Sequence, residues 1–222
     1  EFRVNGVKIH LSHHSSTWIS DCEFRLIGPA VLAKRYEETD VTPESLRLDV
    51  HCRFLHDPDF QNSLQTLEEG VYLFGHSHVQ WNWQDADRNV FLINPGSCGL
   101  PLDFIQDSVS YTVLSVSESG AVSIEEVRVP FDKWAYAEVL RNSEQYRNAN
   151  VWTKVITKEW LNTHEYMTFF LEFAEQFAQG IGDTRRPFAV ETWEKAYEIW
   201  NSSLSSAKAY GECVKDRKII RR

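Results

Sequence analysis

The sequence predicts an α/β protein followed by a helical extension, and three features support this. Short apolar runs rich in β-branched and aromatic residues end at glycine, asparagine or proline, which is typical of buried strands. The segment between Ser15 and Gly70 contains helical patterns and helix-capping residues. The chain after Asp132 is predominantly helical in pattern. We therefore expect strands and helices to share a domain over residues 1–131, with residues 132–222 forming a helical extension packed on the same domain.

Local turn and capping signals define the predicted elements. Asn5–Gly6 favours a hairpin turn between two short extended segments within Arg3–Leu11. Prolines that follow the capping residues Thr42 and Asp57 mark the first turns of two helices. We predict helices over Pro29–Glu38, from Pro43 onward, and from Pro58 to a closing Gly70. We predict strands over Val71–Phe74, Asn89–Ile93, Val109–Val116 and Val122–Val129.

Aromatic side chains recur near helical spacing in the C-terminal extension. They are Trp134, Tyr136, Tyr146, Trp152, Trp160, Tyr166, Phe169, Phe170, Phe173, Phe177, Trp193, Tyr197 and Trp200. A stripe of this kind usually faces a hydrophobic core, and we favour that interpretation over a surface that stacks on a ligand.

Composition limits the classes of partner. The chain has 222 residues, of which 42% are hydrophobic, so it can bury a sizeable core. A formal net charge of -9 disfavours nucleic acid, although an acidic protein can still bind phosphates through metal ions. The four cysteines form no C-x-x-C pair, which favours reduced thiols in a cytoplasmic protein. No apolar run approaches the ~20 residues of a membrane helix, so we expect no membrane partner.

The most informative stretch runs from Val71 to His78, an apolar run that ends in Gly-His-Ser-His. It predicts a buried strand followed by His76 and His78. Their side chains would point to the same place, because residues i and i+2 of an extended chain point the same way. One divalent cation, or two adjacent ones, could be reached by both rings. Imidazole ligands suit Mn, Fe, Zn or Ni more than Mg or Ca. A pair of structural histidines is the commoner meaning of an isolated His-x-His.

A second motif makes the metal interpretation more specific. Gly-His-Ser-His followed by Asn94-Pro95-Gly96-Ser97 resembles the calcineurin-like metallophosphoesterases, in particular their small bacterial branch. The segment from Asn5 to Ser15 is similar to the family's strand that ends in His-Gly, with His13 at the ligand position and His14 in place of the usual glycine. Ser110–Leu114 and Val127–Asp132 resemble the family's closing strand pair and the turn into its last helix. The resemblance covers residues 1 to about 140.

The resemblance implies a fold, an activity and a ligand set. The fold would be a four-layer αββα sandwich, with two packed mixed sheets and outer helices. The activity would be hydrolysis of a phosphate ester or anhydride, such as a nucleotide or a dinucleoside polyphosphate, with two divalent transition-metal ions. His13 and His76 would bind the second metal, His78 would bind the first, and His14 would add a donor to the substrate. Asn94 to Ser97 would shape the loop floor without ligating.

The chain also departs from the family pattern. The motifs Asp-x-His, Gly-Asp-x-x-Asp and Gly-Asn-His-Asp do not occur in it, and we expect an upstream segment to supply them. Gly99 to Asp103 stands where relatives often carry Pro-Arg, so a phosphate clamp is missing. One alternative is a catalytically impaired binding or scaffold module with the same fold. Another is an unrelated hydrolase such as an amidohydrolase, which fits the histidine pair but not Asn94 to Ser97.

Overall fold

The computed structural model describes residues 1–13, 18–36, 41–149 and 151–218, and it describes side chains in these ranges apart from those of residues 18–20 and 205–218. The chain divides into two compact units. Unit 1 comprises Glu1–Val139 and Thr157–Glu165, and unit 2 comprises Leu140–Ile156 and Tyr166–Arg222.

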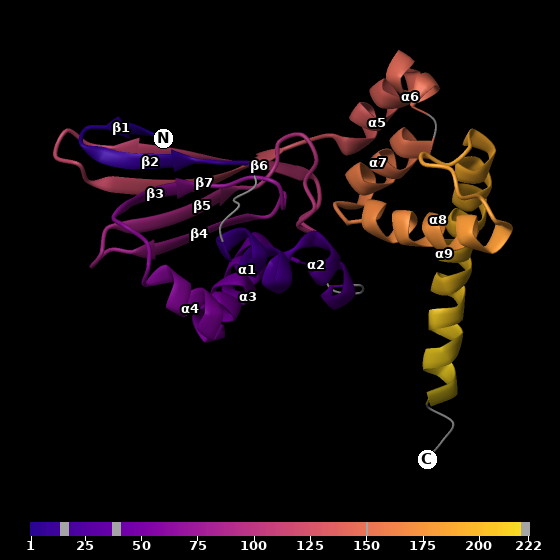
Figure 1. The fold of residues 1–222 in the computed structure, drawn as a ribbon, viewed down its shortest axis with the longest axis horizontal. Helices are drawn as coiled ribbons and strands as arrows, with labels where there is room; N and C mark the ends of the chain where they lie inside the picture. Colours follow the sequence, from indigo (N-terminus) through magenta and orange to yellow (C-terminus); the bar gives the residue numbers. More distant parts are fainter. Residues whose placement is uncertain (14–17, 37–40, 150, 219–222) are drawn as a thin grey trace. The chain divides into compact units, whose positions relative to one another are not determined.

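Unit 1 confirms the predicted α/β class, because it combines a mixed sheet with helices (Figure 1). The sheet has the order β1-β2-β3-β5-β4. Its strands are β1 (Phe2–Val4), β2 (Val7–Leu11), β3 (Gly70–Leu73), β4 (Gln80–Asp85) and β5 (Val90–Pro95). Strands β2, β3 and β5 run parallel, whereas β1 and β4 pair antiparallel to their neighbours. The predicted hairpin turn between β1 and β2 is confirmed, with positive φ at Asn5 and Gly6.

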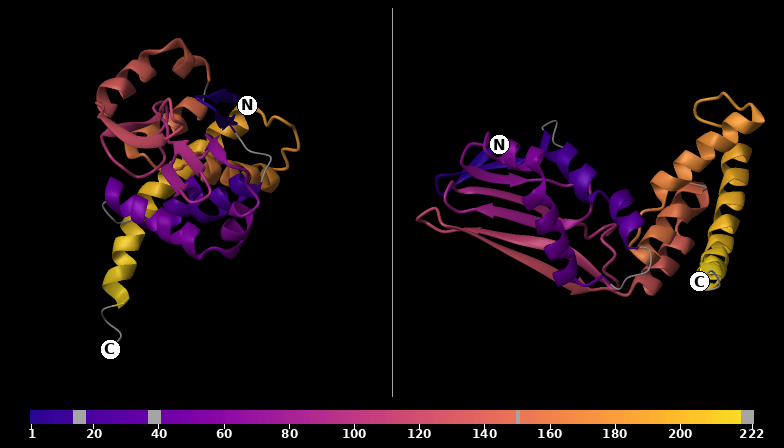
Figure 2. Two further views of the ribbon diagram at one scale, coloured as in Figure 1. Left: turned by 90° about the vertical axis from the view of Figure 1, so that its left-hand side faces the viewer. Right: turned by 90° about the horizontal axis from the view of Figure 1, so that it is seen from below.

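Helices cover one face of this sheet (Figure 2). They are α1 (Trp18–Ile27), α2 (Pro29–Arg35), α3 (Pro43–His56) and α4 (Pro58–Leu64). Thr42 caps α3 in a capping box and Asp57 caps α4, as predicted. Phe54 of α3 packs on Trp81 of β4, with ring centroids 4.7 Å apart, so aromatic contacts join the helical layer to the sheet.

A two-stranded antiparallel sheet packs on the other face. It consists of β6 (Ser108–Val116) and β7 (Val122–Pro130). The contact is hydrophobic: Val71, Phe91 and Ile93 of the large sheet are buried against a set of partly buried residues that includes Leu114, Val122 and Ile124. The layers of unit 1 therefore run helices, mixed sheet, antiparallel sheet.

Two sequence predictions in this region were wrong or incomplete. Gly70 does not close a helix: α4 ends at Leu64, and Gly70 is the first residue of β3, with φ +148. A side chain here would approach the carbonyl oxygen of Lys8 to 2.8 Å, so glycine permits close pairing of β2 and β3. Strand β4 was not predicted, although its Trp81 and Trp83 alternate as strand residues do.

A buried ion pair lies beside β6 and β7. Asp103 is fully buried, and Nη2 of Arg128 on β7 donates to its carboxylate at 2.6 Å. Arg128 Nε also donates to Gln80 Oε1 at 3.1 Å. Burial raises the pKa of Asp103, and the charge and hydrogen bond of Arg128 act in the opposite direction. The pair thus holds the segment after Ser97 against the hairpin.

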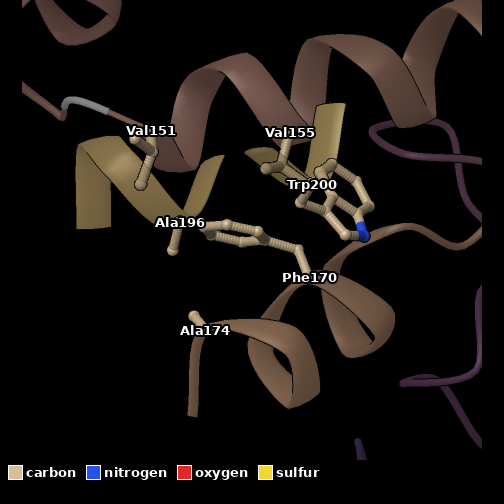
Figure 3. Packing of buried hydrophobic residues seen from close by; sticks show 6 residues of the cluster. All are labelled: Val151, Val155, Phe170, Ala174, Ala196 and Trp200. Carbon is tan, nitrogen blue, oxygen red and sulfur yellow. The ribbon is translucent and has the colours of Figure 1, made fainter. Parts of the chain in front are cut away.

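The chain after Asp132 is helical in the described residues, as predicted. Its helices are α5 (Lys133–Asn142), α6 (Glu144–Asn148), α7 (Val151–Asn162), α8 (Met167–Ile181) and α9 (Val190–Lys218). In unit 2, Phe170 and Trp200 lie at the centre of a cluster with Val151, Val155, Ala174 and Ala196 (Figure 3). Other aromatic residues of the stripe, among them Phe173 and Trp193, pack against this cluster. The core-facing interpretation is therefore confirmed for the stripe residues of this cluster, whereas Trp152 is 42% exposed.

The structure also describes three of the four cysteines and the hydrophobicity of the helices. Cys22, Cys52 and Cys98 are free thiols, and the Cys213 side chain lies outside those described. Among the described residues, none of the helices has the length and hydrophobicity needed to cross a membrane.

Candidate metal-binding site

Three parallel strands end at one edge of the large sheet, and the candidate residues follow them. His13 comes after β2, His76 and His78 come after β3, and Asn94 lies at the end of β5. The backbone pairing continues past the strand ends, because Ser12 N donates to Leu73 O at 3.0 Å and Phe74 N donates to Ile93 O at 2.8 Å. The parallel pairing therefore brings both sequence motifs to one place.

The rings of His13 and His76 lie next to each other. Their centroids are 5.2 Å apart and the ring planes meet at 73°. Two imidazoles on one tetrahedral ion would have centroids roughly 5 Å apart, so this pair fits a shared metal ion. Gly75 allows the close approach: its N–H donates to His13 O at 3.1 Å, and a Cβ there would lie 3.1 Å from His13 Nδ1.

His78 is held by a backbone carbonyl. Its Nδ1 lies 2.7 Å from Leu100 O. Since a carbonyl only accepts, Nδ1 carries the hydrogen, and Nε2 has the lone pair that a metal needs. Ser97 Oγ accepts hydrogen bonds from the N–H groups of Gly99 and Leu100 and so fixes this carbonyl. The Asn-Pro-Gly-Ser motif thereby orients an imidazole of the other motif.

The environment of His78 favours its neutral form. Burial lowers the pKa of His78, and repulsion from a protonated His13 lowers it further. The hydrogen bond to Leu100 O and the negative charge of Glu165 act in the opposite direction but do not outweigh these effects. Neutral imidazole is the form that binds metal ions.

The loop that carries two of the histidines has an unfavourable backbone. His76 and His78 were predicted as residues i and i+2 of an extended chain, and this was wrong. Both adopt left-handed conformations, with φ of 72° and 60°, after β3 has ended. This conformation costs a residue with a side chain roughly 1–2 kcal/mol, and it persists where surrounding contacts enforce it. Residues of this kind cluster at functional sites.

The enforcing contacts converge on Glu23, a buried residue of α1 that sequence analysis missed. Glu23 Oε1 accepts hydrogen bonds from Ser77 Oγ at 2.5 Å, from Trp81 Nε1 at 2.7 Å and from Asn94 Nδ2 at 2.7 Å. Asn94 Nδ2 also donates to Ser77 Oγ and to Gly75 O. Asn94 is therefore a structural centre of the loop floor, as the sequence predicts for this motif. The partners of Glu23 are 54 to 71 residues away along the chain, so no local pattern could reveal it.

The other histidines have structural surroundings or are not described. His14 lies outside the described residues. His10 stacks on Tyr72, His51 stacks on Trp83, and His56 Nδ1 contacts Cys52 O. His164 Nδ1 lies 2.7 Å from Glu165 O, and its ring packs on Phe104. The sequence gives His10, His51, His56 and His164 no partner spacing and so predicts structural or surface residues, which agrees with these contacts.

The described residues do not by themselves form a complete metal site. Among the described residues, no group of three or more His, Cys, Asp or Glu side chains surrounds a common point where a metal ion could be held. His13 and His76 thus offer a pair of ligands, with His78 beside them.

The sequence matches no family model and no curated protein.

The turn after β5 gives a stability prediction, because Gly96 has φ +75 and a Cβ there would lie 2.2 Å from the buried Ser110 Oγ. Gly96→Ala should lower the free energy of unfolding by about 2–4 kcal/mol through backbone strain and overpacking. Urea denaturation measures the change. Gly99→Ala is the matched control, since an added Cβ there meets open space. Equal stability of the two variants would contradict the prediction.

Proposed function

We propose that this chain is a metal-dependent phosphoesterase of the calcineurin-like fold, which hydrolyses a phosphate ester or anhydride of a small substrate. The observation that carries the proposal is the pair of His13 and His76 rings, 5.2 Å apart, in the segments that follow the neighbouring parallel strands β2 and β3. His13 and His76 would hold one divalent transition-metal ion, and His78 would ligate a second through Nε2. Mn, Fe, Zn or Ni are the candidates, because all three donors are imidazoles.

The architecture of unit 1 supports the proposed fold. Its order of helices, mixed sheet and second sheet agrees with part of a four-layer αββα sandwich. The proposed site lies at the carboxyl ends of parallel strands, where α/β proteins commonly bind ligands. The contact between His78 and the carbonyl of Leu100 also supports the proposal, because metal-binding histidines usually donate their other N–H to such a group.

The residues of the chain would perform separate tasks. When bound, the ions supply an acidified water and positive charge for the phosphate oxygens. Gly75 permits the turn that brings His76 to His13, and Asn94 holds that turn through the carbonyl of Gly75. Three imidazoles do not complete two metal centres. The proposed site therefore needs further donors, such as the carboxylates that the resemblance implies.

The substrate is proposed only as a small phosphorylated compound. A nucleotide would gain affinity from stacking on an exposed aromatic ring. Phe170 and Trp200 do not serve this purpose, because both are buried among the helices of unit 2. Trp134 and Trp152, two other members of the stripe, are 62% and 42% exposed and are the rings on which a base could stack.

Metal content tests the proposal directly. Protein purified without chelators, with its intact mass checked, should retain transition-metal ions, and close to two per chain where further donors complete both centres. It should also hydrolyse p-nitrophenyl phosphate or bis(p-nitrophenyl) phosphate, and a chelator should remove the activity. Absence of both retained metal and hydrolysis, with Mn, Fe, Zn and Ni each supplied, would contradict it.

A second candidate is a binding or scaffold module with the same fold. It is favoured by one observation, the lack of a three-ligand group among the described residues. In that case the folded chain would bind at most one weakly held ion and would hydrolyse neither ester. The same metal analysis separates the two candidates.

A further inference from the structure

Helix α1 contacts the histidine loop through two consecutive residues. Glu23 is 1% exposed, and its Oε1 accepts a hydrogen bond from Ser77, the residue between the two histidines of the loop. Phe24 packs against the His76 ring, with centroids 5.0 Å apart. The loop from Gly75 to Val79 is therefore clamped from the helical layer as well as from the sheet.

Ser77 is the point through which the clamp acts. It is fully buried, it donates to Glu23 Oε1, and it accepts from Asn94 Nδ2 at 2.8 Å and from Val79 N at 3.4 Å. These three bonds use the one donor and both acceptor sites of the hydroxyl. Ser77 cannot move without breaking a buried hydrogen bond, and each such loss is unfavourable.

The clamp explains how the loop keeps its unfavourable backbone. His76 and His78 have left-handed φ on either side of Ser77, a conformation that a histidine leaves when nothing enforces it. A change of φ at His76 to an ordinary negative value would move its imidazole away from His13. Glu23 is well placed to resist this, because one of its carboxyl oxygens accepts from Ser77, Trp81 and Asn94 together and is therefore held from three sides.

We propose that Glu23 is the positioning residue of this site, and that its carboxyl group fixes Ser77 so that the imidazole of His76 stays beside that of His13. The metal-affinity part of this inference rests on the proposed function. The geometric part does not, since it concerns ring positions in the protein without metal.

The test compares three full-length proteins. Glu23→Gln keeps the shape of the side chain but replaces one carboxyl oxygen with an amide NH2 group, which donates and does not accept. Phe60→Leu is a stability control, because Phe60 is buried and packs on Phe54 and Trp83, away from the loop. Each protein is measured by thermal denaturation, by zinc titration, and by NMR of the histidine rings, with His76→Ala and His78→Ala used to assign the signals.

We expect Glu23→Gln to weaken zinc binding by about 10- to 100-fold, as loss of an outer-shell partner usually does. It should also shift the ring signals of His76 and His78 in the metal-free protein. Phe60→Leu should lower the melting temperature but keep the zinc affinity and the ring signals. If Glu23→Gln prevents folding, Ser77→Ala removes the loop side of the same bond and should give the same ring shifts.

Two results would overturn the inference. One is unchanged ring signals of His76 and His78 in folded Glu23→Gln or Ser77→Ala. The other is an equal loss of zinc affinity in Phe60→Leu, which would show that any loss of stability has this effect. If the unaltered protein binds no zinc, the proposed function fails, and the ring signals alone decide the role of Glu23.

Discussion

His76→Ala should abolish metal retention and lower phosphoesterase activity by about a hundredfold or more, with little change in stability. The activity loss follows because a metal ligand contributes several kcal/mol of transition-state stabilisation, and each 1.36 kcal/mol is about tenfold in rate. Stability should change little because the ring of His76 is solvent-exposed. Elemental analysis, hydrolysis of p-nitrophenyl phosphate and thermal denaturation measure the three effects.

His56→Ala provides the matched control for this experiment. His56 lies at the exposed end of α3 and contacts only its own helix in the hydrogen bond to Cys52 O. This variant should keep the metal content and the activity of the unaltered protein. Unchanged metal content and activity in His76→Ala would remove His76 from the site, and the pair with His13 would then be structural.

Arg128→Met should lower the free energy of unfolding by about 3–5 kcal/mol, because it leaves the carboxylate of Asp103 buried without its cation. The loss should also grow as the pH rises. Burial already raises the pKa of Asp103 above that of the unfolded chain, and without Arg128 the rise becomes larger. The folded state then binds more protons than the unfolded state, so stability falls as pH increases through the acid range.

Urea denaturation at several pH values between 4 and 8 measures both effects. The double variant Asp103→Leu with Arg128→Met is the control, because it removes the unpaired charge and should recover much of the stability. A loss in Arg128→Met that does not depend on pH would contradict this account of the pair.

Turns and caps were the most predictable parts of the fold. Asn5–Gly6, Thr42 and Asp57 all act within four residues of their own position, so the sequence pattern contains the whole interaction. Gly70 was misread because its partner, Lys8 O, lies on another strand. Strand β4 was missed because glutamine, asparagine and aspartate are poor strand residues, and burial against α3 decides its conformation.

The sequence also predicted part of the candidate site and missed the rest. The Gly-His-Ser-His pattern predicted that His76 and His78 lie together, and the family resemblance alone added His13. The structure brings the rings of His13 and His76 together at the ends of parallel strands. The role of Glu23 could not be predicted, because it depends on the packing of α1 against the sheet. The Leu100 carbonyl is a similar case, since any residue type would provide the same acceptor. Sequence therefore indicated the imidazoles but not the groups that orient them.

The left-handed backbone of His76 and His78 has a consequence for engineering. Glycine accepts this conformation without strain, so a screen that rewards heat resistance alone would enrich glycine at both positions and discard the imidazoles. Stability and activity are thus opposing demands on the same short loop. A library designed to make this protein more stable should keep these two residues fixed and seek its gains in unit 2.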